Sequence, residues 1–177
     1  MYIVEYDVAI ITLVEAIIFN NGVAPVCLGD NICPTVGLAQ TVVGFDEQNA
    51  KGRAAARSLQ QVDVNVWDSA TCNLTADYGG KITDQIFCAG TVGKDSCSGD
   101  SGGPIVTKAE DSWHQTGIVS WDYGCAAADK PGVYAKICAP SIRNFIHQII
   151  GWQTITMVRS SIVVCARFFV LGQSHLF

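Results

Sequence analysis

A serine lies among glycines in the segment GDSGG, residues 99–103, with carboxylates close to it in the chain. Asp100 comes directly before Ser101, and Asp95 lies six residues before it. A serine hydroxyl is a weak nucleophile until a base removes its proton, and the oxyanion that then forms needs preorganised hydrogen-bond donors. The backbone N–H groups of Gly99 and Ser101 are candidates for these donors. The segment therefore predicts nucleophilic catalysis at Ser101 and leaves its base to be found.

The same five residues fit the pattern G-x-S-x-G, which α/β-hydrolases use at a strand-to-helix turn. That turn requires a helix directly after the serine, whereas two glycines and Pro104 follow Ser101. Such residues disfavour the first turn of a helix. An esterase of the hydrolase type is therefore the least favoured alternative.

Composition limits the classes of protein to which the chain can belong. With 177 residues, 49% of them hydrophobic and 15% charged, it should fold as one domain with a sizeable core. A net charge of -5 without a cluster of Lys and Arg argues against a nucleic-acid partner. Acids interrupt the first apolar run, and Arg159 and Arg167 interrupt the last, so no membrane span is predicted.

Strand-like segments must position the serine. Short runs rich in β-branched and aromatic residues alternate with turn residues, and no long helical pattern separates them. The runs cover residues 2–13, 39–45, 84–90, 102–107, 115–121 and 132–137. This pattern predicts an all-β, antiparallel sandwich or barrel.

One helix is predicted near the end of the regular domain, over residues 140–150. Ser141 stands where an N-cap belongs. Apolar residues recur at helical spacing at Ile142, Phe145, Ile146, Ile149 and Ile150. We expect the domain to span residues 1–152 and residues 153–177 to be an apolar extension without function.

The cysteine content indicates an oxidising compartment. The chain has eight cysteines but no C-x-x-C pair and no compact Cys/His cluster, so disulfides are favoured and neither a metal nor another cofactor is expected. Eight cysteines permit 105 complete pairings, and the spacing alone does not choose among them. The first residues lack the basic leader of a signal peptide. We therefore expect a secreted protein whose N-terminal part is missing from this sequence.

The longer string DSCSGDSGGP, residues 95–104, resembles the nucleophile motif of chymotrypsin-fold serine proteases. Four further segments also resemble that family. They are YDVAIITL with the triad aspartate, TVVGF with Phe45 for the tryptophan of a Gly-Trp-Gly strand, SWDYGC as the substrate-pairing strand, and KPGVYAKI as the C-terminal segment. The resemblance covers about residues 1–152 and indicates a trypsin-like member. It implies an antiparallel Greek-key β-barrel, the second of two barrels with the end of the first, and a C-terminal helix.

The resemblance implies a role for each residue that matches the motif. Ser101 would be the nucleophile, Asp7 would orient and stabilise the base, and Gly99 would complete the oxyanion hole. Asp100 would pair with the amino terminus released when a precursor is cut. Asp95 would lie at the base of the specificity pocket and pair with a Lys or Arg side chain of a polypeptide substrate.

Four more residues would line the same pocket. They are Ser120, Trp121, Asp122 and Gly132. Asp122 stands at the pocket rim, where the family usually has glycine, so its side chain is expected to narrow the entrance while its charge attracts a cation.

The resemblance also chooses among the cysteine pairings. It implies disulfides Cys72–Cys88, Cys97–Cys125 and Cys33–Cys138. Cys27 resembles the cysteine that links a protease domain to a separate N-terminal piece, so its partner would lie outside this chain, and Cys165 would be an unpaired thiol. A further pair of the family is absent at both ends, where Gln40 and Thr107 stand.

The base is the missing part of the constellation. The family order is His, Asp, Ser, yet no histidine precedes Asp7, and none lies between Asp7 and Ser101 as the subtilisin order would require. The histidines are His114, His147 and His175. We therefore expect an incomplete serine endopeptidase that cleaves after Arg or Lys and is inactive without its histidine. The alternative is a non-catalytic homologue that binds or regulates a partner.

Overall fold

The computed structural model describes residues 4–45, 47–49, 52–75, 77–96, 99–124, 129–150 and 170–171. The strands are β1 Ala9–Ile10, β2 Cys27–Leu28, β3 Ala39–Gly44, β4 Glu47–Asn49, β5 Gly52–Ala55, β6 Gln60–Val66, β7 Ile86–Gly90, β8 Pro104–Ala109, β9 Ser112–Trp121, β10 Gly132–Lys136 and β11 Val170–Leu171. The helices are α1 Ser69–Leu74 and α2 Pro140–Ile150.

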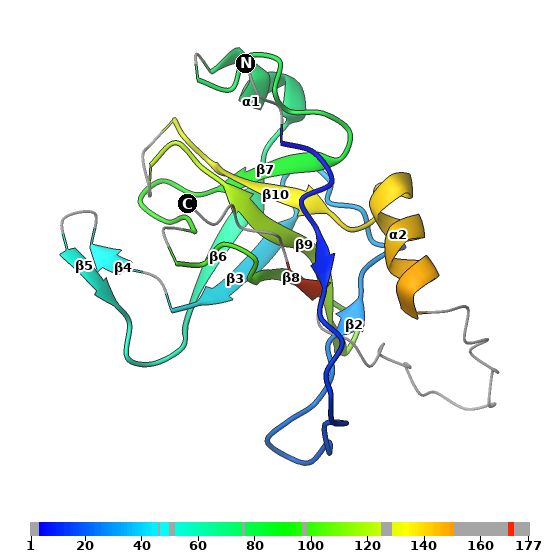
Figure 1. Cartoon of the computed structure of the whole chain (residues 1–177). Helices are drawn as coiled ribbons and strands as arrows, with labels where there is room; N and C mark the ends of the chain where they lie inside the picture. Colours follow the sequence, from blue (N-terminus) through cyan, green and yellow to red (C-terminus); the bar gives the residue numbers. More distant parts are fainter. Residues whose placement is uncertain are drawn as a thin grey trace.

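Six antiparallel strands of the described part form a closed barrel (Figure 1). Their order is β10, β7, β6, β3, β8 and β9, and β9 pairs with β10 to close the ring. Strand β2 adds to β9 in parallel, and β4 and β5 form a separate hairpin that projects from the barrel. The prediction of an all-β antiparallel barrel with a C-terminal helix is confirmed.

The barrel interior is filled by side chains of alternate strand positions. Val42, Val64, Ile105, Phe87 and Tyr134 are all buried there. A second core lies between the barrel and α2, where Ile118 and Ile137 pack with Ile142 and Ile146 of the helix. These two cores hold β9 from both sides, and β9 is the strand to which the candidate site is attached.

Strand β6 belongs to the barrel but is not among the strands predicted from the sequence. Its burial alternates along the sequence, with Val64 and Val66 buried and Asp63 and Asn65 exposed. Strand β6 pairs with β3 in antiparallel orientation over six residue pairs and is therefore one of the strands of the barrel. The period-2 pattern in QVDVNV was the signal that could have identified it.

The first predicted strand is mostly not a strand. Within residues 4–13, the described part of this run, only the two residues of β1 pair, with β11, and residues 11–24 form an exposed loop that extends from the barrel (Figure 1). Val14 and Ile18 are among the large apolar side chains exposed there. A hydrophobic run predicts a strand only where a neighbouring strand is available to pair with it.

Helix α2 begins at Pro140, so Ser141 lies in its first turn instead of at the predicted N-cap. Proline suits the first helical position because its missing N–H has no partner within the helix there. Ile142 and Ile146 are buried, whereas Ile149 is exposed. The helix therefore covers the barrel with a narrower apolar face than the sequence predicts.

Two disulfides lie among the described residues, Cys33–Cys138 and Cys72–Cys88, and they are two of the three pairs that the resemblance implies. The expected pair Cys97–Cys125 lies outside the described residues, as does Cys165.

Cys27 differs from its expectation. It is 3% exposed in β2 and is disulfide-bonded within this chain, to a partner outside the described residues. Because its sulfur is buried and already bonded, it does not offer a thiol to a separate N-terminal piece in this structure.

Buried polar groups occupy the place of the disulfide that the family would have between positions 40 and 107. Thr116 Oγ1 donates to Gln40 Oε1 at 2.7 Å, and Thr107 Oγ1 donates to the Ala39 carbonyl at 3.0 Å. Gln40, Thr107 and Thr116 are all buried. Hydrogen bonds therefore join β3 to β8 and β9 at this point.

Candidate active site

Asp7 is held against the end of β9. It is 8% exposed, and Ser120 Oγ donates a hydrogen bond of 2.5 Å to its Oδ2. The preceding residue, Tyr6, is exposed and has a φ of 56°, and its carbonyl accepts a hydrogen bond from the Val8 N–H at 2.7 Å. This tight turn places Asp7 inside while its neighbour stays in solvent, and the carboxylate is thereby fixed in one orientation.

The turn that carries Ser101 is attached to the same strand. The Gly102 N–H donates to the Val119 carbonyl, and the Val119 N–H donates to the Gly103 carbonyl, both at 2.9 Å. Ser101 itself is exposed at the tip of this turn. Neighbouring residues of β9, Val119 and Ser120, therefore anchor the candidate nucleophile and the candidate triad aspartate at one end of the barrel.

The candidate oxyanion donors lie in the same turn. Gly99 has a φ of 116°, in the left-handed region that favours glycine. Asp100 is 6% exposed and is directed toward β3, because a Cβ atom added to Gly44 would lie only 1.8 Å from Asp100 Oδ1. The buried carboxylate anchors the centre of the turn, so Gly99 and Ser101 flank it at the surface.

Asp95 packs directly against Gly132. Its Oδ1 accepts hydrogen bonds from the N–H groups of Ser96, at 2.8 Å, and Gly132, at 3.1 Å. A Cβ atom added to Gly132 would lie 2.6 Å from Asp95 Oδ1 and 2.9 Å from both Ser96 Oγ and Tyr134 OH. Only glycine at position 132 therefore fits against these three polar groups, and Ser96 and Tyr134 are themselves buried.

Tyr134 completes this polar group. Its hydroxyl lies 3.0 Å from Ser96 Oγ in a hydrogen bond. Burial, followed by the negative charge of Asp95, raises the pKa of Tyr134 above the ordinary tyrosine value. The phenol therefore stays neutral around neutral pH, and Asp95 remains the group that can supply negative charge to the base of the pocket.

Three aromatic rings pack against one another close to Gly132. Tyr78 stacks on Trp121 with ring centroids 5.5 Å apart, and Tyr123 meets both rings edge-on at 5.2 and 5.5 Å. The Tyr78 hydroxyl donates to the Pro131 carbonyl at 2.7 Å, directly before Gly132. Sequence reasoning missed Tyr78, which lies between Cys72 and Cys88 and is brought to the site by tertiary packing alone.

Two carboxylates contribute to the electrostatic environment of Tyr78. Burial, then the negative charges of Asp95 and Asp122, raise the pKa of Tyr78. Both carboxylates therefore lie close enough to Tyr78 for their charges to act on its hydroxyl.

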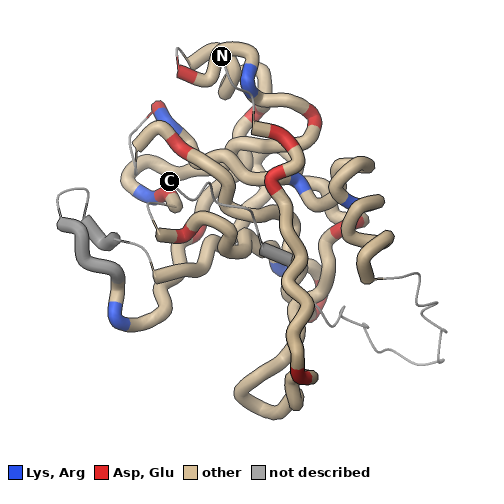
Figure 2. The backbone as a smooth tube through the Cα atoms, viewed as in Figure 1, with Lys and Arg blue, Asp and Glu red and all other residues tan. Residues whose placement is uncertain are grey.

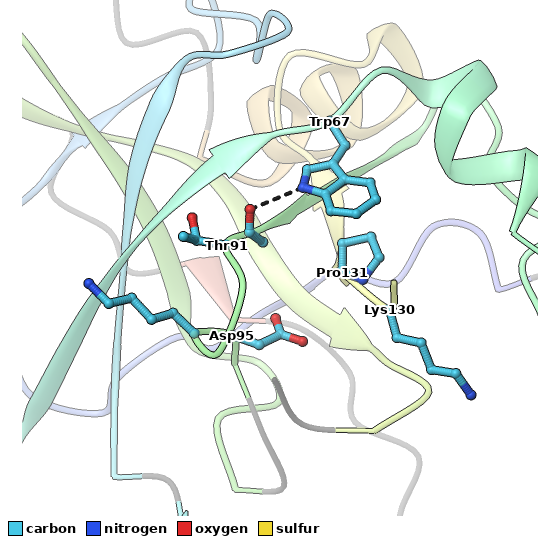
Figure 3. Close-up of a pocket in the computed structure, with 7 residues that line it drawn as sticks. Trp67, Thr91, Asp95, Lys130 and Pro131 are labelled. Carbon is cyan, nitrogen blue, oxygen red and sulfur yellow. Dashed lines mark hydrogen bonds between the residues drawn. The ribbon is translucent and has the colours of Figure 1, made fainter. Parts of the chain in front are cut away.

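A pocket opens on another side of Asp95 (Figure 3). Its lining residues are Trp67, Gly90, Thr91, Lys94, Asp95, Lys130 and Pro131. It shares only Asp95 with the expected specificity pocket. Trp67 Nε1 donates to the Gly90 carbonyl at 3.0 Å, and the Lys130 side chain extends away to pair with Asp77 at 2.7 Å.

The described histidines are placed away from this site. His114 pairs with Thr107 and Cys27 across neighbouring strands and precedes Ser120 by six residues of β9, a separation of about 20 Å at ~3.3 Å per residue. His147 Nε2 lies 2.7 Å from Asp30 Oδ2. His175 lies outside the described residues.

Comparison with known proteins identifies the family. The family model described as Trypsin matches residues 2–146. The chain belongs to the trypsin family. It is 39% identical to the anionic trypsin of Canis lupus familiaris over 150 residues, which cover 84% of this chain and 56% of that protein. It is 40% identical over 139 residues to trypsin-1 of Salmo salar, which cover 77% of this chain and 54% of that protein.

Two further relatives extend the comparison of this trypsin-family chain. Transmembrane protease serine 11E of Mus musculus is 40% identical over 139 residues, which cover 76% of this chain and 33% of that protein. The structure of neuropsin, a serine protease of mouse brain, superposes with a TM-score of 0.65 at 32% identity and covers 75% of this chain. The trypsin-family chain thus spans about half the length of the two trypsins that it matches.

Proposed function

We propose that this trypsin-family chain carries the nucleophile and the specificity pocket of a serine endopeptidase that cleaves after Lys or Arg. The observation that carries the proposal is the partly buried Asp95 carboxylate, which the Ser96 and Gly132 N–H groups hold at a point where only glycine fits beside it. A partly buried carboxylate is stabilised when a substrate cation pairs with it. Aromatic or small apolar side chains of a substrate would leave that charge without a cation.

The proposed reaction is acyl transfer through Ser101. A base takes the proton of the hydroxyl as its oxygen attacks the substrate carbonyl, and the N–H groups of Gly99 and Ser101 bind the resulting oxyanion. The base then gives this proton to the leaving amine, and water hydrolyses the acyl-enzyme by the same steps. Asp7, held by Ser120, would stabilise the positive charge on the base.

We propose that the base is supplied by residues outside this sequence. His114 and His147 are held elsewhere in the fold, and the chain matches only about half of the length of the two trypsins. Residues 1–152 would then be the protease part, with residues 153–177 beyond the family match. Because Cys27 already belongs to a disulfide, we do not propose that it bonds to a segment outside this sequence.

We also propose that the protein works outside the cell. Two disulfides are described, and Cys27 belongs to a third. Such bonds persist in oxidising compartments. In the part of the chain that the structure describes, no helix has both the length and the apolar character needed to cross a membrane.

A panel of peptides that differ only in the residue before the scissile bond tests the proposed specificity. The natural protein, purified from its source, should cleave the Arg and Lys peptides at least about thirtyfold faster than the Phe and Ala peptides, because only a cation pairs with Asp95. Measured values of kcat/KM decide the outcome. Equal or faster turnover of the Phe peptide would contradict the assignment of Asp95.

A non-catalytic homologue is the second candidate, favoured by the positions of the two described histidines. It would bind basic peptides through Asp95 and release them unchanged. Binding of the Arg peptide without cleavage by the natural protein would select this candidate.

A further inference from the structure

Asp122 continues the line of β9 past the pocket. It follows Trp121, and its Oδ1 accepts a hydrogen bond from the Gly124 N–H at 2.9 Å. The pairing of β9 with β10 shifts register between Val119 and Trp121, so Ser120 is the extra residue of a β-bulge just before Asp122. Asp122 lies close enough to Tyr78 for its charge to raise the pKa of that phenol, as Asp95 does. The side chain is partly buried, and its carboxylate is held in place by the turn that follows it.

The rings beside Asp122 form a platform that suits a cation. Trp121 and Tyr123 flank it in sequence, and their centroids are 5.5 Å apart. Tyr123 is 38% exposed, so its surface is open to a ligand. Aromatic faces attract ammonium and guanidinium groups and also cover the methylene stems of these side chains.

The chain already places a cation of its own on this platform. Lys81 Nζ lies 4.7 Å from the Tyr123 ring centroid, contacts the Tyr123 hydroxyl, and donates to the Asp77 carbonyl at 2.8 Å. An ammonium group is therefore held at this corner by aromatic and oxygen contacts together. This contact shows independently of Asp122 that the corner is suited to positive charge.

We propose that Asp122, with the Trp121–Tyr123 platform, forms a second cation subsite that selects peptides with two basic residues. One would pair with Asp95, and the other, within about three residues of it along an extended peptide, would pair with Asp122. The inference rests on the proposed function, because Asp95 must hold the first basic residue. It names a narrower substrate class than a single Lys or Arg.

Lys81 opposes the second cation by charge repulsion. Its ammonium group lies over the Tyr123 ring, where the positive charge of a ligand on this ring would be repelled. Removing this charge should therefore favour a dibasic ligand, whereas removing the Asp122 charge should disfavour it. The two substitutions should therefore shift the preference for a dibasic over a monobasic peptide in opposite directions.

Fluorescence anisotropy on the full 177-residue chain can measure this preference for a dibasic peptide. The probes are labelled peptides with one Arg, and matched peptides that carry in addition a second Arg or a Gln at each of the three positions on either side of it. The readout is the ratio of the Kd of the one-Arg peptide to that of the two-Arg peptide. We expect a ratio of about three to five at one position, larger at low salt.

Three variants sharpen the experiment. Asp122→Asn keeps the shape and the acceptor for the Gly124 N–H, and it should bring the ratio to about one. Lys81→Gln should raise the ratio above that of the unaltered chain. Asp95→Asn should weaken both peptides together, which separates the two sites.

The outcomes distinguish the inference from the proposed function. If the one-Arg peptide does not bind, or binds equally well to Asp95→Asn, the proposed pocket and the second subsite both fail. If it binds through Asp95 but the second Arg gives no gain at any position, only the second subsite is overturned. A gain that persists in Asp122→Asn overturns it as well.

Discussion

A serine-directed fluorophosphonate should label Ser101 of the 177-residue chain at least about a thousand times more slowly than it labels the active serine of a full-length trypsin-family protease. The hydroxyl is exposed, so access does not limit the reaction. The reaction is limited by the lack of a base, because His114 lies about 20 Å along β9 from Ser120 and His147 is paired with Asp30. Without a base the serine keeps its proton and attacks slowly.

Intact-protein mass spectrometry over time measures this rate, and Ser101→Ala gives the background. Labelling that matches the full-length protease would contradict the placement of the base outside this sequence. His114→Gln, His147→Gln and His175→Gln would then identify the histidine that serves.

Asp95→Asn should weaken binding of the fluorescent cation p-aminobenzamidine at least about thirtyfold, because it removes the charge that pairs with the amidinium. Asparagine keeps an oxygen that accepts from the Ser96 and Gly132 N–H groups, so the loop geometry should survive. The measurement is a fluorescence titration of the chain and its variants.

Asp111→Asn is the matched control for this prediction, since it removes an equal charge from an exposed turn between β8 and β9. It should leave the Kd within about twofold of the original value. An equal loss in both variants would mean that net charge, and not the Asp95 pocket, attracts the ligand. Unchanged binding by Asp95→Asn would place the cation elsewhere.

The barrel was predictable from short β-branched runs because strand burial repeats every two residues. The run at residues 2–13 shows the limit of this reasoning, since in its described part, residues 4–13, only β1 pairs, and Ile11 and Leu13 are exposed. The hydrophobic pattern shows only that a segment could form a strand. Whether it pairs depends on which other strand the fold places beside it. For β6 the opposite holds, because QVDVNV carries the period-2 signal and β3 lies beside it as a partner.

Local sequence also identified only part of the candidate site. Ser101, Gly99 and Asp95 lie within one continuous motif, so their types and spacing were enough to single them out. Tyr78 and Lys81 lie in the loop between Cys72 and Cys88, and no local pattern connects them to Asp122. Their contribution depends on tertiary contacts with residues more than 40 positions later in the chain.

The link between nucleophile and pocket is tested most directly by a pair of peptidyl phosphonates, one with an Arg-like and one with a Phe-like side chain next to the phosphorus. Each is incubated with the natural protein, and the modified residue and its rate are determined by peptide mapping. The Arg-like compound should modify Ser101 at least about thirtyfold faster, since Asp95 would hold its cation while Ser101 attacks the phosphorus. Equal rates for the two compounds, or modification at a residue other than Ser101, would contradict a basic-specific active site built on Ser101 and Asp95.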